Sequence, residues 1–502
     1  MKSLKMFWAL AIFAFAVLGA AAVWLGGLNQ DEGWYLYAAN MVADGKMLYR
    51  DFFYTQGPEM PSFYGAFTWV WGKWGLLGGR IFTLALGLMG IVIAAGLARR
   101  LAPEGRKGAA ALVTFLLLGC NLYHLYYVAI PKTYALASLF VTVGFFLLAV
   151  GKKPVFQFAA GLTLAYAAGT RVSLGALLCV AGLGLLFARR WKALLWFCVG
   201  GFGGLALVYG PFLCDSGARA GLVAAQQYHA ARGGFDPVWT VGSFSRLVRW
   251  YLPVFVVLGL GVAHALMARA GVSANARASQ SIEQSEQSIN PSILLGGFLA
   301  VFVVQMLAPF PYEDYQVPIL GLLAVSAAVA LVSTAVDSSR LPSMVLLTLG
   351  LAFANSFGSP LLEKWSVNGQ DRFWSLKKEK CELAQLRDVA KRVEQLDPGG
   401  KTLLTQDLYL AIETGRKVPK GLEMGPFSML TDAEWRTLLG QADCPIAAMS
   451  GYAFAVEPPV CNERPLDRQL EYWSILKRNY EFVERHDSFG QNATPLLVLR
   501  HK

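Results

Sequence analysis

Long apolar runs dominate the first 357 residues of the chain. A helix needs about 20 mainly apolar residues to cross the hydrocarbon core of a bilayer, and residues 6–28 form one such run. Further apolar runs follow near residues 79–97, 108–123, 134–150, 155–169, 173–188, 193–212, 251–268, 293–309, 316–334 and 342–357. With its flanks, each run is long enough to cross. The pattern therefore predicts a polytopic α-helical membrane protein with about eleven transmembrane helices.

The first apolar run has a second interpretation, as a cleaved secretory signal peptide. Its stretch Ala20-Ala21-Ala22 has the small residues of a cleavage site. The apolar core of a signal peptide spans about 7–15 residues, however, and this run is longer and continues through Val23 and Trp24. We therefore expect an uncleaved first span.

Composition agrees with a membrane protein. Charged residues make up 15% of the chain and hydrophobic residues 55%, whereas about a quarter of an ordinary soluble domain is charged. Residues 1–357 hold 24 basic and 13 acidic residues (24 − 13 = 11), and residues 358–502 hold 20 of each, so the apolar part carries the whole net charge of +11. This distribution argues against nucleic-acid binding and for the charge bias of membrane loops.

The basic residues of the apolar part cluster in every second gap between the runs, as the positive-inside rule requires of cytoplasmic loops. This alternation predicts a multi-pass protein of the cytoplasmic (inner) membrane with a cytoplasmic N-terminus. The Ser- and Gln-rich segment 270–292 then becomes a cytoplasmic linker, and residues 358–502 lie outside. The clusters are Lys2/Lys5, Arg99/Arg100/Arg106/Lys107, Lys152/Lys153, Arg189/Arg190/Lys192, Arg269/Arg277 and Arg340.

The first outer loop, residues 29–78, contains two carboxylates that follow the first span directly, Asp31 and Glu32. Aromatic residues recur behind them at helical spacing. An aromatic belt at the membrane surface explains the tryptophans and tyrosines, but it does not explain carboxylates fixed at the mouth of a span. A carboxylate there can accept a proton from a hydroxyl group or attract a cation. Asp31 is therefore our first candidate for a functional residue.

Two cations also lie beside apolar sequence at the outer surface, Lys132 and Arg171. One interpretation is that their side chains reach to water or lipid headgroups, which is the commoner fate of a lone basic residue. The other is that they bind a phosphate, because arginine forks onto phosphate and lysine acts as a point charge. The histidines lack metal-ligand spacing, so the sequence predicts no metal site.

A set of motifs runs through roughly residues 6–335. They are Asp31-Glu32-Gly33-x-Tyr35-x-Tyr37-Ala38-Ala39, Gly45-Lys46-x-x-Tyr49-Arg50-Asp51-Phe52, Gln56-x-Pro58 with Pro61, Ala168-Gly169-Thr170-Arg171, Tyr228-His229, and Pro311-Tyr312 to Tyr315 ahead of Pro318. In these motifs the chain resembles glycosyltransferase family 39, a group with the GT-C fold. The closest likeness is to the RgtA/B/C/D-like branch, in the superfamily of the protein mannosyltransferases and aminoarabinose transferases.

The resemblance implies a GT-C-like domain at residues 1–357 and transfer of a sugar from a polyprenyl-phosphate donor on the outer face of the membrane. It implies that Asp31, with Glu32 beside it, is the catalytic carboxylate, and that Lys132 and Arg171 bind the donor phosphate. The acceptor (lipid, glycan or protein), the sugar and any need for a divalent metal stay open, and no cofactor is inferred. Further candidates for substrate binding are Arg50, Asp51, Tyr228, His229, Asp314 and Tyr315.

Residues 358–502 are charge-balanced and hold no membrane-length run. Short apolar stretches at 401–405 and 495–499 predict strands, and the segment 377–396 predicts an amphipathic helix. We therefore expect a small extracytoplasmic α/β domain here. Cys444 and Cys461 could form a disulfide in an oxidising compartment.

Two other function classes remain open from the sequence. A transporter would require polar or charged residues in the middle of its spans, and only Gln305 and Thr163 are mild examples. A non-catalytic membrane scaffold predicts nothing about Asp31. The glycosyltransferase interpretation accounts for the acidic loop, the outer cations and the outer domain together.

Overall fold

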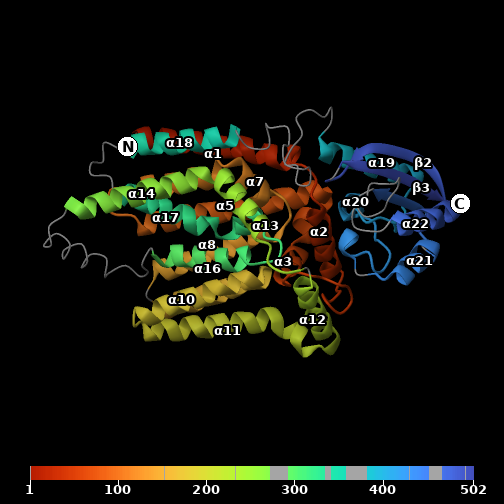
Figure 1. Cartoon of the computed structure of the whole chain (residues 1–502), viewed down its shortest axis with the longest axis horizontal. Coiled ribbons are helices and arrows are strands. Elements are labelled where there is room, and N and C mark those ends of the chain that lie inside the picture. The colour runs from red at the N-terminus through yellow and green to blue at the C-terminus, as the bar shows by residue number, and fades with distance from the viewer. Residues whose placement is uncertain are drawn as a thin grey trace.

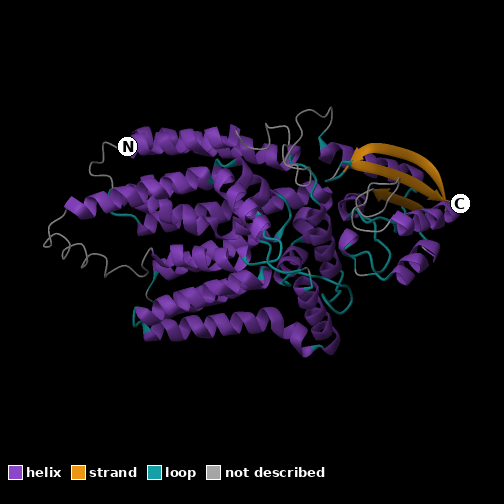
Figure 2. Cartoon of the chain, in the orientation of Figure 1, coloured by secondary structure: helices purple, strands orange, loops and turns teal. Residues whose placement is uncertain are grey.

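The structure is a computed structural model composed mainly of helices (Figure 2). The segments that it describes are 2–151, 153–231, 233–271, 292–333, 341–357, 381–428, 430–441, 443–450, 466–491 and 493–502.

The N-terminal part is a bundle of long helices that run side by side along the longest axis of the molecule (Figure 1). The N-terminus lies at one end of the bundle, and α2, α12 and the C-terminal region lie toward the other. The helices of this part are α1 (Lys2–Leu25), α2 (Gln30–Ala43), α3 (Glu59–Ala66), α4 (Thr68–Trp71), η1 (Gly72–Trp74), α5 (Gly75–Leu101), α6 (Lys107–Gly119), α7 (Leu122–Ala129), α8 (Thr133–Val150), α9 (Pro154–Thr170), η2 (Val172–Gly175), α10 (Ala176–Phe187), α11 (Trp191–Cys214), α12 (Ser216–Ala230), α13 (Pro237–Trp250), α14 (Leu252–Gly271), α16 (Ser292–Met306), η3 (Glu313–Ile319), α17 (Leu320–Ser333) and α18 (Leu341–Phe357).

Each predicted apolar run lies mostly on one of these helices, and the runs 108–123, 173–188 and 316–334 each extend onto a second one. Within the described segments, five helices can cross a membrane by length and composition, or there are up to seven spans if each of two bent helix pairs counts as one. The bent pairs are α6 with α7 and α13 with α14. The multi-pass helical architecture is thus confirmed, and the number of eleven crossings stays a prediction. The predicted linker 270–292 falls almost wholly outside the described residues.

The start of α2 is fixed by a capping box and by a buried ion pair. The side chain of Asn29 accepts a hydrogen bond from the backbone of Asp31, and the Asn29 backbone donates to Glu32 Oε1 at 3.0 Å. Arg80 of α5 donates one hydrogen bond to each carboxylate oxygen of Glu32, with each N–O distance 2.7 Å. Its guanidinium also donates to the carbonyl oxygens of Val23 and Gly26 at the end of α1. One arginine therefore joins α1, α2 and α5.

The loop before α3 packs closely on the end of α9. A Cβ added at Gly57 would overlap the carbonyl oxygen of Gly169, so only glycine permits this approach. A Cβ at Gly169 would lie 3.2 Å from the Cβ of Glu59. Glu59 is therefore packed against α9, and burial raises its pKa to about 8. The contact places Arg171, which follows α9, next to the first loop.

Where the structure describes it, the C-terminal region combines four α-helices and a short 3-10 helix with a three-stranded antiparallel sheet of order β1-β3-β2 (Figure 2). The predicted helix and the second predicted strand are present as α19 and β3. Residues 401–405 instead form isolated bridges, in which Leu404 pairs with Ala447 of β1. The elements are α19 (Glu382–Leu396), α20 (Leu408–Thr414), η5 (Gly425–Phe427), α21 (Asp432–Gln441), β1 (Ile446–Ser450), α22 (Leu466–Asn479), β2 (Tyr480–Phe489) and β3 (Thr494–His501).

This region docks on the first turn of α2. A Cβ added at Gly33 would overlap the backbone nitrogen of Tyr409, so the glycine lets the start of α20 approach. The amide of Gln30 donates to Asp407 Oδ1 at 2.9 Å and to the Tyr409 hydroxyl at 3.1 Å. The Leu28 backbone donates to Glu382 at 2.7 Å. The two parts therefore share buried polar contacts.

The division into domains at residue 358 stays a prediction, as does the extracytoplasmic position of the second part. Cys444 is buried, and its predicted partner Cys461 lies outside the described residues. The disulfide therefore also stays a prediction.

We expect Arg80→Ala to destabilise the protein strongly, because it leaves the buried Glu32 carboxylate without its cation. Breaking a buried pair in this way costs about 3–5 kcal/mol. The measurement is the unfolding midpoint of the detergent-solubilised protein. Arg50→Ala is the matched control, since Arg50 pairs with Asp51 at the surface and its loss should leave the midpoint unchanged. Equal midpoints for the two variants would contradict a structural role of the Glu32–Arg80 pair.

We also expect Glu59 to make stability depend on pH. Its pKa is about 8 in the folded chain and 4.5 as the unperturbed value, so between these values the folded state holds a proton that the unfolded state has lost. Stability should therefore be highest below pH 4.5 as far as this group is concerned, and should fall as the pH rises toward 8. Glu59→Gln should flatten the dependence of the unfolding midpoint over this window. An unchanged slope would show that Glu59 is ionised in the folded protein.

Candidate active site at the start of helix α2

Asp31 lies in the first turn of α2, where its carboxylate contacts two other side chains. Lys132 Nζ lies 3.0 Å from Asp31 Oδ2, and Trp34 Nε1 donates to Asp31 Oδ1 at 3.0 Å. The side chain of Asp31 remains 30% exposed, whereas that of Lys132 is 8% exposed. Asp31 is therefore held in place while a substrate can still reach it.

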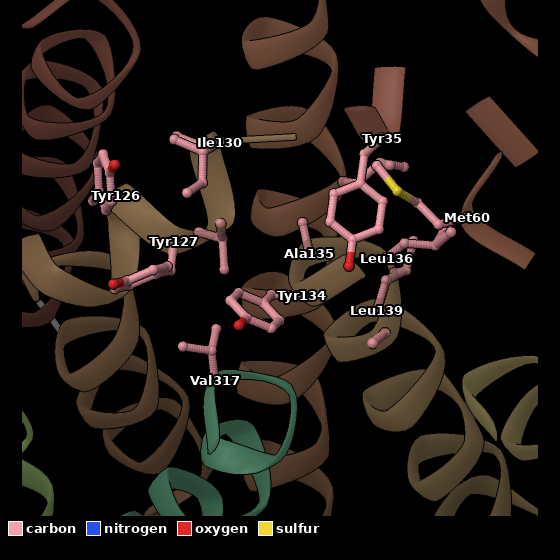
Figure 3. Packing of buried hydrophobic residues seen from close by; sticks show 14 of the residues in the cluster. Tyr35, Met60, Tyr126, Tyr127, Ile130, Tyr134, Ala135, Leu136, Leu139 and Val317 are labelled. Carbon is pink, nitrogen blue, oxygen red and sulfur yellow. The ribbon is translucent and has the colours of Figure 1, made fainter. Parts of the chain in front are cut away.

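Lys132 connects Asp31 to a second carboxylate. Its Nζ lies 3.4 Å from Asp314 Oδ2 in η3, and the hydroxyl of Tyr134 donates to the same oxygen at 2.8 Å. Tyr134 is buried beside Tyr127 and Val317 (Figure 3). Since Lys132 lies directly before α8 and Asp314 precedes α17, the lysine joins three distant segments of the chain at one point.

Arg171 lies on the same side of the bundle, between two aromatic rings. Its guanidinium carbon is 5.0 Å from the centre of the Tyr134 ring and 4.7 Å from that of Tyr315. Its Nη1 donates to Thr133 Oγ1 at 3.3 Å, next to Lys132 in the chain. Such stacking holds the guanidinium in place and leaves N–H groups available for an anion.

Tyr35 lies within electrostatic reach of all three charged groups. Burial is the main cause that raises its pKa, and the charge of Asp31 raises it further, while Arg171 and Lys132 lower it. The carboxylate and the two cations thus all lie near one buried tyrosine. The structure therefore brings together the predicted residues Asp31, Lys132 and Arg171.

Two cavities meet beside Arg171. A polar cavity of about 270 Å³ is lined by Arg171 itself and by uncharged polar side chains, among them Gln56 and Gln226. An apolar cavity of about 520 Å³ lies along α9, α10 and α11 and is lined by residues such as Leu178 and Phe202. Val172 and Gln226 line both cavities. A ligand with a long apolar tail and a polar head could occupy the two together.

The structure gives Glu32 a different place from the one expected for a catalytic group. Its side chain is fully buried, and both of its oxygens are bound by Arg80. Its direct role in this arrangement is to fix the first turn of α2, and thereby the position of Asp31. The sequence shows two neighbouring carboxylates, but at adjacent helix positions their side chains point in different directions.

Of the remaining candidates, Arg50 and Asp51 form a surface ion pair, and His229 and Tyr315 line the polar cavity. Arg50 forms exposed ion pairs with Asp51 at 3.0 Å and with Asp215 at 3.4 Å, away from the contacts of Asp31. His229 lines the polar cavity, and its Nε2 hydrogen-bonds the carbonyl oxygen of Thr55 at 2.7 Å. Tyr228 packs on the ring of Phe53. Tyr315 lines the polar cavity and stacks on Arg171.

Tyr134, Thr133 and Trp34 are site residues that sequence reasoning missed. Tyr134 and Thr133 follow Lys132 directly, so proximity to a candidate cation was the available signal. Trp34 is three residues after Asp31, on the same face of α2. Among the described residues, no group of three or more His, Cys, Asp or Glu side chains could hold a metal ion.

Comparisons with known proteins give matches by structure. Neither models of protein families nor curated protein sequences match the chain. The structure of ArnT from Cupriavidus metallidurans bound to undecaprenyl phosphate matches with a TM-score of 0.60 and 14% identity, covering 99% of this chain and 97% of that one. ArnT in the apo state matches with a TM-score of 0.59 at the same identity and coverage.

An oligosaccharyltransferase from Archaeoglobus fulgidus, in complex with Zn and sulfate, matches with a TM-score of 0.47 and 12% identity, covering 96% of this chain and 72% of that chain. The match to ArnT extends over nearly the full length of both chains and includes the C-terminal region. The chain is therefore a multi-pass membrane protein with the GT-C fold, the fold of glycosyltransferases such as ArnT.

Proposed function

We propose that this protein is a membrane glycosyltransferase that moves a sugar from a polyprenyl-phosphate donor to an acceptor. The observation that carries the proposal is the partly exposed Asp31 carboxylate, 3.0 Å from Lys132, with Arg171 nearby. Arg171 lines a polar cavity that adjoins an apolar one. A carboxylate to activate a hydroxyl, cations for a phosphate and a groove for a lipid tail are the parts that this reaction requires.

The donor would span both cavities. Its polyprenyl tail would lie in the apolar cavity, where burial of hydrocarbon is favourable. Its phosphate would lie beside Arg171, whose fork of N–H groups matches phosphate oxygens. The structure of ArnT bound to undecaprenyl phosphate supports this assignment, because that protein has the same fold.

The chemical step would begin with Asp31 as general base. Asp31 takes the proton of the acceptor hydroxyl as the acceptor oxygen bonds to the anomeric carbon of the sugar. The bond from that carbon to the phosphate oxygen breaks, and its electron pair leaves with the polyprenyl phosphate. Arg171 and Lys132 would offset the charge that develops on the departing phosphate. The Oδ atoms of Asp31 keep lone pairs available beyond their bonds to Trp34 and Lys132.

Glu32 and Arg80 would then act as positioning residues, because their ion pair fixes the helix turn that carries Asp31. Asp314 would be a second carboxylate that holds Lys132, with its Oδ2 3.4 Å from Nζ. In this scheme the lysine stays beside the phosphate site whether Asp31 is charged or has taken up the proton.

The proposed orientation follows the charge pattern. The basic clusters would face the cytoplasm, and the site and the C-terminal region would lie outside the cytoplasmic membrane. Figure 1 supports this arrangement, because the N-terminus and the C-terminal region lie at opposite ends of the bundle. Transfer would then take place on the outer face.

We expect Asp31→Asn to lower kcat for sugar transfer by about 10²–10⁴-fold, since an amide cannot accept the proton. The variant should fold, because Lys132 keeps Asp314 as its partner. The measurement is transfer of radiolabelled sugar from polyprenyl-phosphate donors by purified protein.

Asp44→Asn is the matched control, because Asp44 lies at the other end of the same helix and pairs with Lys417 at the surface. Its activity should equal that of the wild type. Equal activity of Asp31→Asn and wild type would remove Asp31 from the mechanism, and a wild type that transfers no sugar from any donor would overturn the proposed function.

A further inference from the structure

The charge of the polar cavity bears on the sugar that it can accept. Arg171 is the one lysine, arginine, aspartate or glutamate among the described residues that line this cavity. The other polar groups come from uncharged amides and hydroxyls and from one imidazole, that of His229. Aromatic and proline side chains complete the wall. These uncharged lining residues include Gln56, Ser173, Gln226, Phe310 and Tyr315.

Such a wall suits an uncharged carbohydrate. Sugar hydroxyls both donate and accept hydrogen bonds, and amide and hydroxyl side chains offer both functions. The flat apolar face of a sugar ring packs on aromatic rings, which Phe310 and Tyr315 provide. A site built to hydrogen-bond hydroxyl groups also rejects analogues that leave its polar groups unpaired.

A charged sugar lacks its counter-charge in this cavity. An aminosugar brings an ammonium group, which needs a carboxylate when it leaves water, and a uronic acid brings a carboxylate, which needs a cation. If Arg171 binds the donor phosphate, no further cation remains among the described lining residues.

Three carboxylates nearby already have partners, and burial raises the pKa of a further one, Glu59, to about 8, so that it holds a proton at neutral pH. Asp31 and Asp314 share Lys132, and Glu313 pairs with Arg246 at 3.0 Å. An ammonium group would have to displace one of these cations.

The junction of the two cavities determines where the sugar lies. Val172, next to Arg171, and Gln226 line both cavities. With the tail in the apolar cavity and the phosphate at Arg171, the group on the far side of the phosphate enters the polar cavity. We infer that the donor carries an uncharged sugar, a neutral hexose or pentose, and that the Gln226 amide contacts it at the junction. This inference rests on the proposed function and adds the class of sugar to it.

A panel of donors tests the inference. Polyprenyl phosphates that carry a neutral hexose, a neutral pentose, an aminosugar or a uronic acid are offered to the full-length protein in detergent, and kcat/KM is measured for each. We expect kcat/KM for at least one neutral donor to exceed that for both charged donors by about 100-fold or more. A preference for the aminosugar or the uronic acid would overturn the inference and leave the transferase proposal intact.

Gln226→Leu tests the contact itself. Loss of one hydrogen bond to the sugar should lower kcat/KM for the neutral donor about tenfold. Gln227→Leu is the matched control, because Gln227 is the next residue of α12, is exposed and is not among the lining residues of either cavity. Equal effects of the two substitutions would contradict a role of Gln226 in sugar binding.

A binding measurement separates this inference from the proposed function. The unfolding midpoint is measured with polyprenyl phosphate alone and with each sugar-bearing donor at the same concentration. The neutral sugars should raise the midpoint beyond the value for polyprenyl phosphate, and the charged sugars should not. If the wild type transfers no sugar but shows this difference, the catalytic proposal fails and the sugar class stands. If the midpoints do not depend on the sugar, the inference fails.

Discussion

The buried ion pair between Glu32 and Arg80 is the contact on which the geometry of the site depends. Burying two charges is costly, and the pair is tolerated because Arg80 uses its remaining N–H groups on carbonyl oxygens at the end of α1. Those carbonyls have no partner within their own helix. The arginine thus satisfies the end of one helix and fixes the start of the next. Asp31 is adjacent to Glu32, so the ion pair of Glu32 with Arg80 also fixes the turn that carries Asp31.

Around this anchor, the site is assembled from segments that are far apart in the chain. Lys132 comes from the loop before α8, Arg171 from the end of α9 and Asp314 from η3. All three lie where a helix begins or ends, and the helix bundle brings these ends to one level. The candidate residues thus lie at helix ends and in loops, and the packed helices hold them in a rigid frame.

The sequence predicted the helices well because a bilayer requires long apolar segments whose backbone groups pair internally. Each apolar run became a helix for that reason. The proximity of Asp31 to Lys132 and Arg171 was expected from the resemblance to family 39, not from the spacing of these residues in the sequence. Arg80 was missed because it lies within an apolar run, and one sequence does not tell which residue of another helix faces it. The pairing of Glu32 with Arg80 could not be predicted for the same reason, and the catalytic role expected of Glu32 stays a prediction. Residues 401–405 form only isolated bridges, Thr402 with Lys417 and Leu404 with Ala447 of β1. An apolar pattern cannot distinguish such bridges from a strand.

Gly33 shows how the second part of the chain bears on the first. Because it has no side chain, the backbone at Tyr409 can rest directly on α2, and Gln30 can reach Asp407. The C-terminal region therefore packs directly on the helix that carries Asp31. A chain that ended before α20 would lack these contacts, and the first turn of α2 would be exposed to water. An extension beyond the exposed Lys502 would touch none of these contacts.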